Sequence, residues 1–151
     1  MINLNSSAVV CRPVGQVFEF LSMPENDVWW HYGTLAASTL TEGIPSKGTF
    51  FRSIGHWMGR RNLSTFEVTE YDPNRKYGFK SVSGPLSSQT SYTLGMGHNG
   101  CTKIEISIQA DVVDLFQMEE GILEEKMKRQ LKEDLKMLKD LLKTNAAVST
   151  D

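Results

Sequence analysis

The sequence predicts an α+β domain in which a curved antiparallel sheet of about seven strands wraps around one long C-terminal helix. Three observations indicate this fold. Residues from Met118 to Lys143 carry apolar side chains at helical spacing and contain no proline. Residues from Leu35 to Val112 instead form short apolar runs separated by turn residues. Two short helical segments follow the first strand, which is an unusual order of elements.

The segment Met118–Lys143 predicts one amphipathic helix, because its apolar residues recur at steps of four or three. They are Leu123, Met127, Leu131, Leu135, Leu138 and Leu142. About 26 residues at 1.5 Å each span roughly 39 Å, so this apolar stripe needs a large partner surface, which the strands offer. A homodimer through this helix is an alternative. It would need a strict seven-residue repeat, whereas the steps here are mostly four.

The chain opens with a strand at residues 2–11 that is β-branched toward its end. Pro13 cannot donate to a ladder and suits the first helical position, so a short helix is expected to run to about Leu21. A second short helix or turn is expected from Pro24 to Trp30. The carboxylates Glu25 and Asp27 are assigned to its start, where acidic residues are common.

Turn residues divide the middle of the chain into further strands. These are expected at Leu35–Glu42, Thr49–Trp57, Arg60–Tyr71, Lys76–Ser83, Ser87–Gly95 and Thr102–Val113. The last strand alternates apolar and polar residues, as a sheet covered on one face does. Short connections predict a meander. Such a sheet curls and touches the long helix along part of its length, which leaves a cavity that the two short helices close at one end.

Composition limits the class of protein. The 151 residues are 40% hydrophobic and 23% charged, which is typical of one soluble globular domain. We expect this domain at residues 1–143 and a disordered tail at residues 144–151. The net charge of −2 leaves no general attraction to nucleic acid or acidic membranes. No signal peptide is recognised, and no apolar run approaches the roughly 18 residues of a membrane span.

The two cysteines, Cys11 and Cys101, are far apart in the sequence and form no CxxC motif. We therefore expect reduced thiols in a cytoplasmic protein, with a Cys11–Cys101 disulfide as the less favoured alternative. The sequence has no zinc-ligand spacing, no phosphate- or dinucleotide-binding glycine loop and no hydrolase motif, so no metal or cofactor is expected.

Four segments, together with the order of elements, resemble a known family. They are Arg12–Leu21 (RPVGQVFEFL), Trp29–Trp30, Gly48–Phe51 (GTFF) and Phe66–Pro73 (FEVTEYDP). The chain resembles the polyketide cyclase/dehydrase branch of the START-like (SRPBCC) superfamily over residues 1–143. The resemblance implies the helix-grip fold of plant pollen allergens and lipid-transfer START domains. The family includes ligand carriers, aromatases and cyclases, and chaperone-associated modules, so the fold leaves the function open.

The candidate ligand-binding residues are those expected to face the cavity from the strands, the short-helix junction and the long helix. They are Trp30, Arg52, His56, Ser64, Phe66, Phe79, Tyr92, Met118, Leu123 and Met127. Arg52 and His56 share one face of their strand and Phe51 shares the other, and the sequence does not decide which face points inward. If the Arg52 face does, Arg52 and His56 could hold a carboxylate or an enolate-like oxygen. Otherwise both are solvated.

Three functions remain open at this point. Binding or transport of a small hydrophobic ligand, such as a lipid, is favoured because it needs only a cavity. A polyketide cyclase- or aromatase-like enzyme would need an acid–base pair drawn from Arg52, His56, Tyr92 or His31. A protein-interaction module would use the outer sheet face or the long helix. No catalytic residue is assigned.

Overall fold

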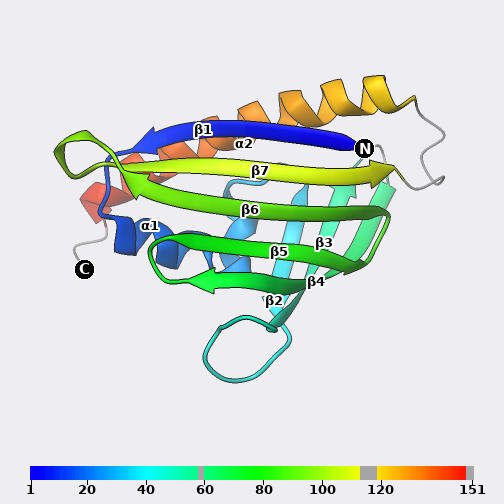
Figure 1. Cartoon of the computed structure of the whole chain (residues 1–151), viewed down its shortest axis with the longest axis horizontal. Coiled ribbons are helices and arrows are strands. Elements are labelled where there is room, and N and C mark those ends of the chain that lie inside the picture. The colour runs from blue at the N-terminus through cyan, green and yellow to red at the C-terminus, as the bar shows by residue number, and fades with distance from the viewer. Residues whose placement is uncertain (58–59, 113–118, 149–151) are drawn as a thin grey trace.

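Seven strands form one antiparallel sheet in the order β1-β7-β6-β5-β4-β3-β2 (Figure 1). The computed structural model describes residues 1–57, 60–112 and 119–148. The strands are β1 (Ile2–Val10), β2 (Thr34–Thr39), β3 (Phe50–Trp57), β4 (Arg60–Asp72), β5 (Lys76–Ser83), β6 (Leu86–Met96) and β7 (Thr102–Val112). Strands β2 to β7 form the expected meander. Strand β1 pairs antiparallel with β7 and so forms one edge of the sheet.

The helices are α1 (Val14–Leu21), the 3-10 helix η1 (Pro24–Trp29) and α2 (Glu120–Val148), with a short 3-10 turn η2 (His98–Gly100) between β6 and β7. The two short helices after the first strand are therefore confirmed, the second as a tight 3-10 helix. Helix α2 continues five residues past the expected end at Lys143. Strand β2 ends three residues before the expected Glu42.

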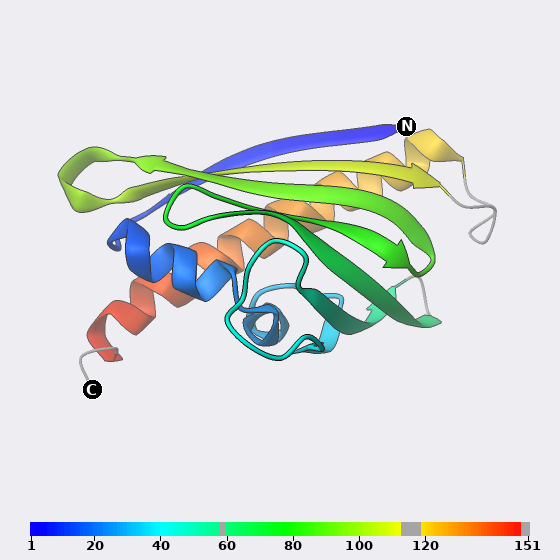
Figure 2. The same cartoon turned by 60° about the horizontal axis from the view of Figure 1, so that its bottom comes forward.

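Helix α2 crosses the concave face of the sheet, and α1 and η1 lie on that same side (Figure 2). The apolar stripe expected on this helix is buried at five positions: Leu123, Leu131, Leu135, Leu138 and Leu142. Burying five leucines contributes on the order of 10 kcal/mol, so packing against the sheet stabilises the helix far more than its own propensity does. The leucine stripe from Leu123 to Leu142 is therefore used within the chain.

Cys11 and Cys101 form a disulfide, so the expectation of reduced thiols is wrong. The reason is the register of two strands. Val10 pairs with Thr102 at the end of the β1–β7 ladder, and the next residue outward on each strand is a cysteine. The two cysteines are 90 residues apart along the chain, so their positions in the sequence do not indicate that they are close in space. The inference of a cytoplasmic location rested on reduced thiols, and the bonded pair removes that basis.

Candidate ligand-binding cavity

A cavity of about 220 Å³ lies between the concave face of the sheet, the segment around η1 and helix α2. The sheet, the segment around η1 and helix α2 each contribute to its apolar lining. The apolar lining residues are Trp30, Phe51, Phe66, Phe79, Leu86, Ile106, Ile108 and Leu131. Its polar lining consists of Asp27, His31, Thr34, Ser53, Ser88, Thr90 and Tyr92. Sites for drug-sized ligands typically measure about 300–1,000 Å³, so this cavity suits a smaller molecule.

Aromatic rings from neighbouring strands form one wall of the cavity. Phe51 of β3 and Phe66 of β4 are opposite each other in the ladder, and their rings stack with centroids 5.1 Å apart. Phe79 of β5 meets both rings edge-on, at 5.3 and 5.4 Å. Tyr92 of β6 continues the wall, 5.9 Å from Phe79. The four rings therefore pack against one another in the stacked and edge-on geometries that aromatic pairs prefer, and they form one continuous wall.

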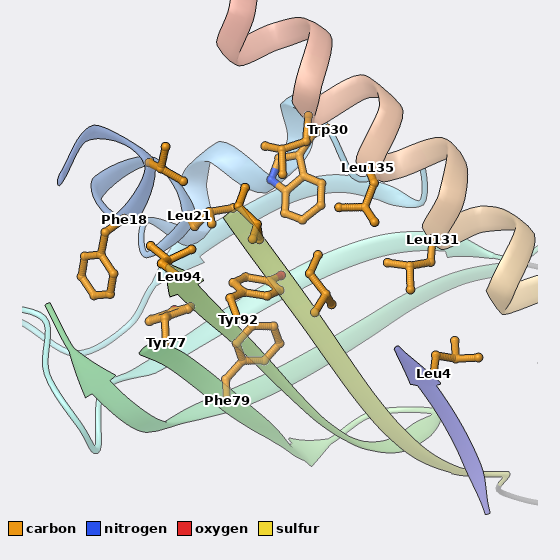
Figure 3. Close-up of a cluster of buried hydrophobic side chains, with 14 of the residues drawn as sticks. Leu4, Phe18, Leu21, Trp30, Tyr77, Phe79, Tyr92, Leu94, Leu131 and Leu135 are labelled. Carbon is orange, nitrogen blue, oxygen red and sulfur yellow. The ribbon is translucent and has the colours of Figure 1, made fainter. Parts of the chain in front are cut away.

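Trp30 faces this wall from the other side of the cavity. Its ring centroid lies 6.1 Å from that of Tyr92, and its side chain is 2% exposed. Figure 3 shows Trp30 close to α2, with Tyr92 and Phe79 below it on the sheet and Leu131 projecting from the helix. The indole Nε1 is buried and has no hydrogen-bond partner among the described residues. The cavity is thus enclosed by rings on two sides.

The 3-10 helix η1 brings a carboxyl group to this apolar space. The main-chain carbonyl of Asp27 accepts hydrogen bonds from the N–H of Trp30 at 3.2 Å and of His31 at 2.8 Å. This turn places all three side chains on the cavity. Glu25, two residues earlier, instead accepts hydrogen bonds from the N–H of Thr39 at 2.7 Å and from its hydroxyl at 3.3 Å. Glu25 therefore ties η1 to β2, whereas Asp27 faces inward.

A second carboxylate, Asp134 of α2, holds the chain after η1 in position. Asp134 is 7% exposed and accepts hydrogen bonds from Gln130 Nε2 at 2.8 Å and from the N–H of Tyr32 at 3.1 Å. Its other oxygen lies 3.4 Å from His31 Nδ1. Because His31 lines the cavity, this network connects the cavity wall to the long helix.

Burial perturbs the acid–base properties of two cavity groups. It raises the pKa of Asp27 from its usual 3.8 to about 6, an effect that nearby His31 opposes and Glu25 reinforces. Burial, together with the charge of Asp27, raises the pKa of the Tyr92 hydroxyl well above its usual 10, so this hydroxyl stays neutral. The cavity thus contains a carboxyl group that titrates near neutral pH and a phenol that can donate a hydrogen bond.

Four of the predicted ligand-binding residues line the cavity: Trp30, Phe66, Phe79 and Tyr92. Leu123 is fully buried and Met127 is packed against the core, but Leu131 is the α2 residue that reaches the cavity. Ser64 is opposite Ser53 in the β3–β4 ladder and close to Gly84, but it is not one of the residues that line the cavity. The prediction for Met118 concerns a residue outside the described part of the chain.

Arg52 and His56 point away from the cavity. Phe51 and Ser53 line it from β3, and successive side chains on a strand alternate between faces, so Arg52 and His56 are on the outer face. Both are exposed. The interpretation in which they supply polar groups to the pocket is therefore wrong, because the phenylalanine face of the strand packs inward.

Asp27 was expected only at a helix start and not in the cavity. In a 3-10 helix, residues three apart lie on the same side, and Asp27 is three residues before Trp30. Because Trp30 was expected to pack inward, this spacing could have placed the carboxyl group beside it.

The described residues form no centre for a metal ion and no helix that could cross a membrane. Within residues 1–57, 60–112 and 119–148, no three histidine, cysteine or acidic side chains are grouped so that they could hold a metal. Over the same residues, no helix has the length and apolar character needed to cross a membrane.

The fold and the cavity define a START-like helix-grip protein, and comparisons with known proteins agree. The family model for polyketide cyclase/dehydrase and lipid transport proteins matches residues 1–143, so the chain belongs to this family. No curated protein matches the chain.

Three solved structures illustrate the shared fold. A START superfamily protein from Mycobacterium smegmatis has a TM-score of 0.81 at 11% identity, over 95% of this chain and 99% of that one. TTHA0849 from Thermus thermophilus has a TM-score of 0.76 at 12% identity, over 99% of each chain. The di-domain ARO/CYC BexL from the BE-7585A biosynthetic pathway has a TM-score of 0.73 at 14% identity, over 93% of this chain and 46% of that one. Identities this low show the fold alone.

Proposed function

We propose that the protein binds a small hydrophobic molecule in the cavity between the sheet and α2. The observation that carries this proposal is the cavity of about 220 Å³, which is lined mainly by aromatic and aliphatic side chains. The cavity combines a mostly apolar lining with a few polar side chains, as sites for small ligands usually do. A space of this size corresponds to the liquid volume of about seven water molecules, so it accommodates one ring with a short substituent.

The size of the cavity sets the expected affinity. A ligand of about ten non-hydrogen atoms gains about 0.5–0.8 kcal/mol from each, within the range seen for small ligands. The resulting binding free energy of about −5 to −8 kcal/mol corresponds to dissociation constants from about 200 μM to about 1 μM. Such affinities require direct binding methods, such as ligand-observed NMR or calorimetry.

The test uses two neighbouring serines on β6. Ser88 lines the cavity, and Ser87 is exposed on the opposite face. Ser88→Phe places a ring inside the cavity, where it competes for the space that a ligand needs, and is expected to abolish the binding of small neutral aromatics such as indole. Ser87→Phe adds the same ring outside the cavity and should retain binding. The proposal fails if the unmodified protein binds no small aromatic, or if both variants bind it equally well.

Proton-transfer catalysis is a second candidate function, favoured by the pKa of about 6 at Asp27. A carboxyl group that titrates near working pH is suited to general acid–base catalysis, which typically contributes about 10²–10⁴-fold in rate. In a polyketide cyclase- or aromatase-like reaction, Asp27 would remove a proton and the neutral Tyr92 hydroxyl would stabilise the enolate oxygen. Cyclisation of a short poly-β-keto thioester should then depend on Asp27. Turnover that survives Asp27→Asn unchanged would exclude this role.

A further inference from the structure

The charged groups around the cavity are unevenly distributed. Among the described residues, no lysine or arginine side chain lines the cavity, and Asp27 supplies the carboxyl group inside it. His31 is the one lining residue there that can carry a positive charge, and it is shared with Asp134. A partly desolvated carboxylate without a dedicated cationic partner is an unfavourable arrangement unless a ligand supplies the cation.

The ionisable groups around Asp27 are mostly acidic. Glu25 of the same helix adds negative charge, and His31 opposes it. The charge of Asp27 helps to raise the pKa of the hydroxyl groups of Tyr77 on β5 and Tyr92 on β6. The charge of Asp134 on α2 also raises the pKa of Tyr92. Three carboxyl groups, Glu25, Asp27 and Asp134, therefore lie near this end of the cavity, which Asp27 alone of the three lines, against the one imidazole of His31. This field disfavours an anionic ligand such as a fatty acid and favours a cation.

The aromatic lining is suited to the same ligand. An ammonium group is attracted to the faces of aromatic rings, most strongly those of tryptophan and tyrosine. Trp30 and Tyr92 lie on the cavity together with Asp27, and Phe79 continues the wall behind Tyr92. Figure 3 shows the three rings facing the same interior space. A ring and an ammonium group joined by a short chain would match the apolar wall and the carboxyl end at once.

We propose that the ligand of this cavity is a small aromatic or cyclic amine, bound as the ammonium ion with its nitrogen at Asp27 and its ring among Trp30, Phe79 and Tyr92. This inference rests on the proposed binding function and adds the chemical class of the ligand. Binding requires the ionised form of Asp27 and the protonated form of the amine. Affinity should therefore rise as the pH increases through about 6, the pKa of Asp27, and fall again when the amine loses its proton.

The test compares three probes of the same size and shape: 2-phenylethylamine, 2-phenylethanol and phenylacetate. They carry a positive charge, no charge and a negative charge at pH 7.5. Calorimetry or ligand-observed NMR should show the amine binding at least about tenfold more tightly than the alcohol, the ratio expected for one charge-assisted hydrogen bond. Phenylacetate should bind most weakly.

Two matched variants complete the experiment. Asp27→Asn should remove the preference for the amine over the alcohol. Asp72→Asn makes the same chemical change at an exposed turn, where the side chain lies near Arg75, and should preserve the preference for the amine. Thermal unfolding verifies that each variant is folded.

The outcomes separate the two proposals. If the alcohol binds and the amine binds no more tightly, or phenylacetate binds best, the binding function stands and the amine inference is overturned. The amine inference is also overturned if Asp27→Asn binds the amine as well as the unmodified protein does. If none of the three probes binds, the binding function itself fails.

Discussion

Replacing Asp27 with asparagine should stabilise the protein at neutral pH. The folded protein raises the pKa of Asp27 from 3.8 to about 6, so the ionised carboxylate is less favourable in the folded state than in the unfolded one. A difference of about two pKa units, at 1.36 kcal/mol each, corresponds to about 3 kcal/mol. This is an upper limit for the gain from Asp27→Asn, because Asp27 keeps partial exposure and the new amide also needs hydrogen-bond partners.

The pH dependence of this effect has a definite sign. Between pH 3.8 and about 6 the folded state binds more protons at Asp27 than the unfolded state, so stability falls as the pH rises through this window. The loss is complete about one pH unit above 6. About one pH unit below 3.8 the carboxyl group is neutral in both states, and at pH 4 most of the effect of Asp27→Asn should already be absent. The variant should therefore gain stability over the unmodified protein as the pH rises from 4 to 8.

Urea unfolding followed by circular dichroism, at several pH values from 4 to 8, measures this gain. Asp72→Asn serves as the control, because Asp72 lies exposed at the end of β4. If Asp27→Asn proves less stable than the unmodified protein at pH 8, the carboxylate has a favourable partner and the reasoning fails. A gain that is the same at pH 4 and pH 8 would equally refute it, since burial of a charge would then have no part in it.

Two further predictions concern the scaffold around the cavity. Asp134→Ala leaves the N–H of Tyr32 and the amide of Gln130 without their acceptor, and should lower the free energy of unfolding by about 1–3 kcal/mol. Glu133→Ala, at the exposed neighbouring position, is the urea-unfolding control, and equal losses would contradict this role for Asp134. Reducing the disulfide between the ends of β1 and β7 removes the cross-link of a 90-residue loop and should cost about 2–5 kcal/mol. An unfolding midpoint unchanged by reductant, with both thiols shown by alkylation to be free, would disprove that contribution.

Much of the cavity lining could be predicted from periodicity. Phe66, Phe79 and Tyr92 each stand in an alternating strand, and alternation assigns them to a face together with their apolar neighbours. Trp30 could be placed because it follows a short helix directly and belongs to a dense aromatic cluster. These positions depend on local pattern, which is present in a single sequence.

The orientation of β3 shows where periodicity stops being informative. A period of two tells which residues share a face but not which face is inward. Both faces of β3 carry a large apolar residue, Phe51 on one and Ile54 on the other. In the structure, Phe51 packs against Phe66 and Phe79, so its face of β3 points inward. Arg52 and His56 therefore lie on the outer face.

Local patterns in the sequence predict the α+β fold, the meander and the buried stripe of α2, because helical and strand periods and turn residues act over short distances. The pairing of Cys11 with Cys101 and the inward position of Asp27 depend instead on tertiary contacts. The first depends on the register between strands 90 residues apart, and the second on how η1 packs against the sheet and α2. Both are contacts between segments that are distant along the chain, and no local pattern specifies which of the available contacts forms.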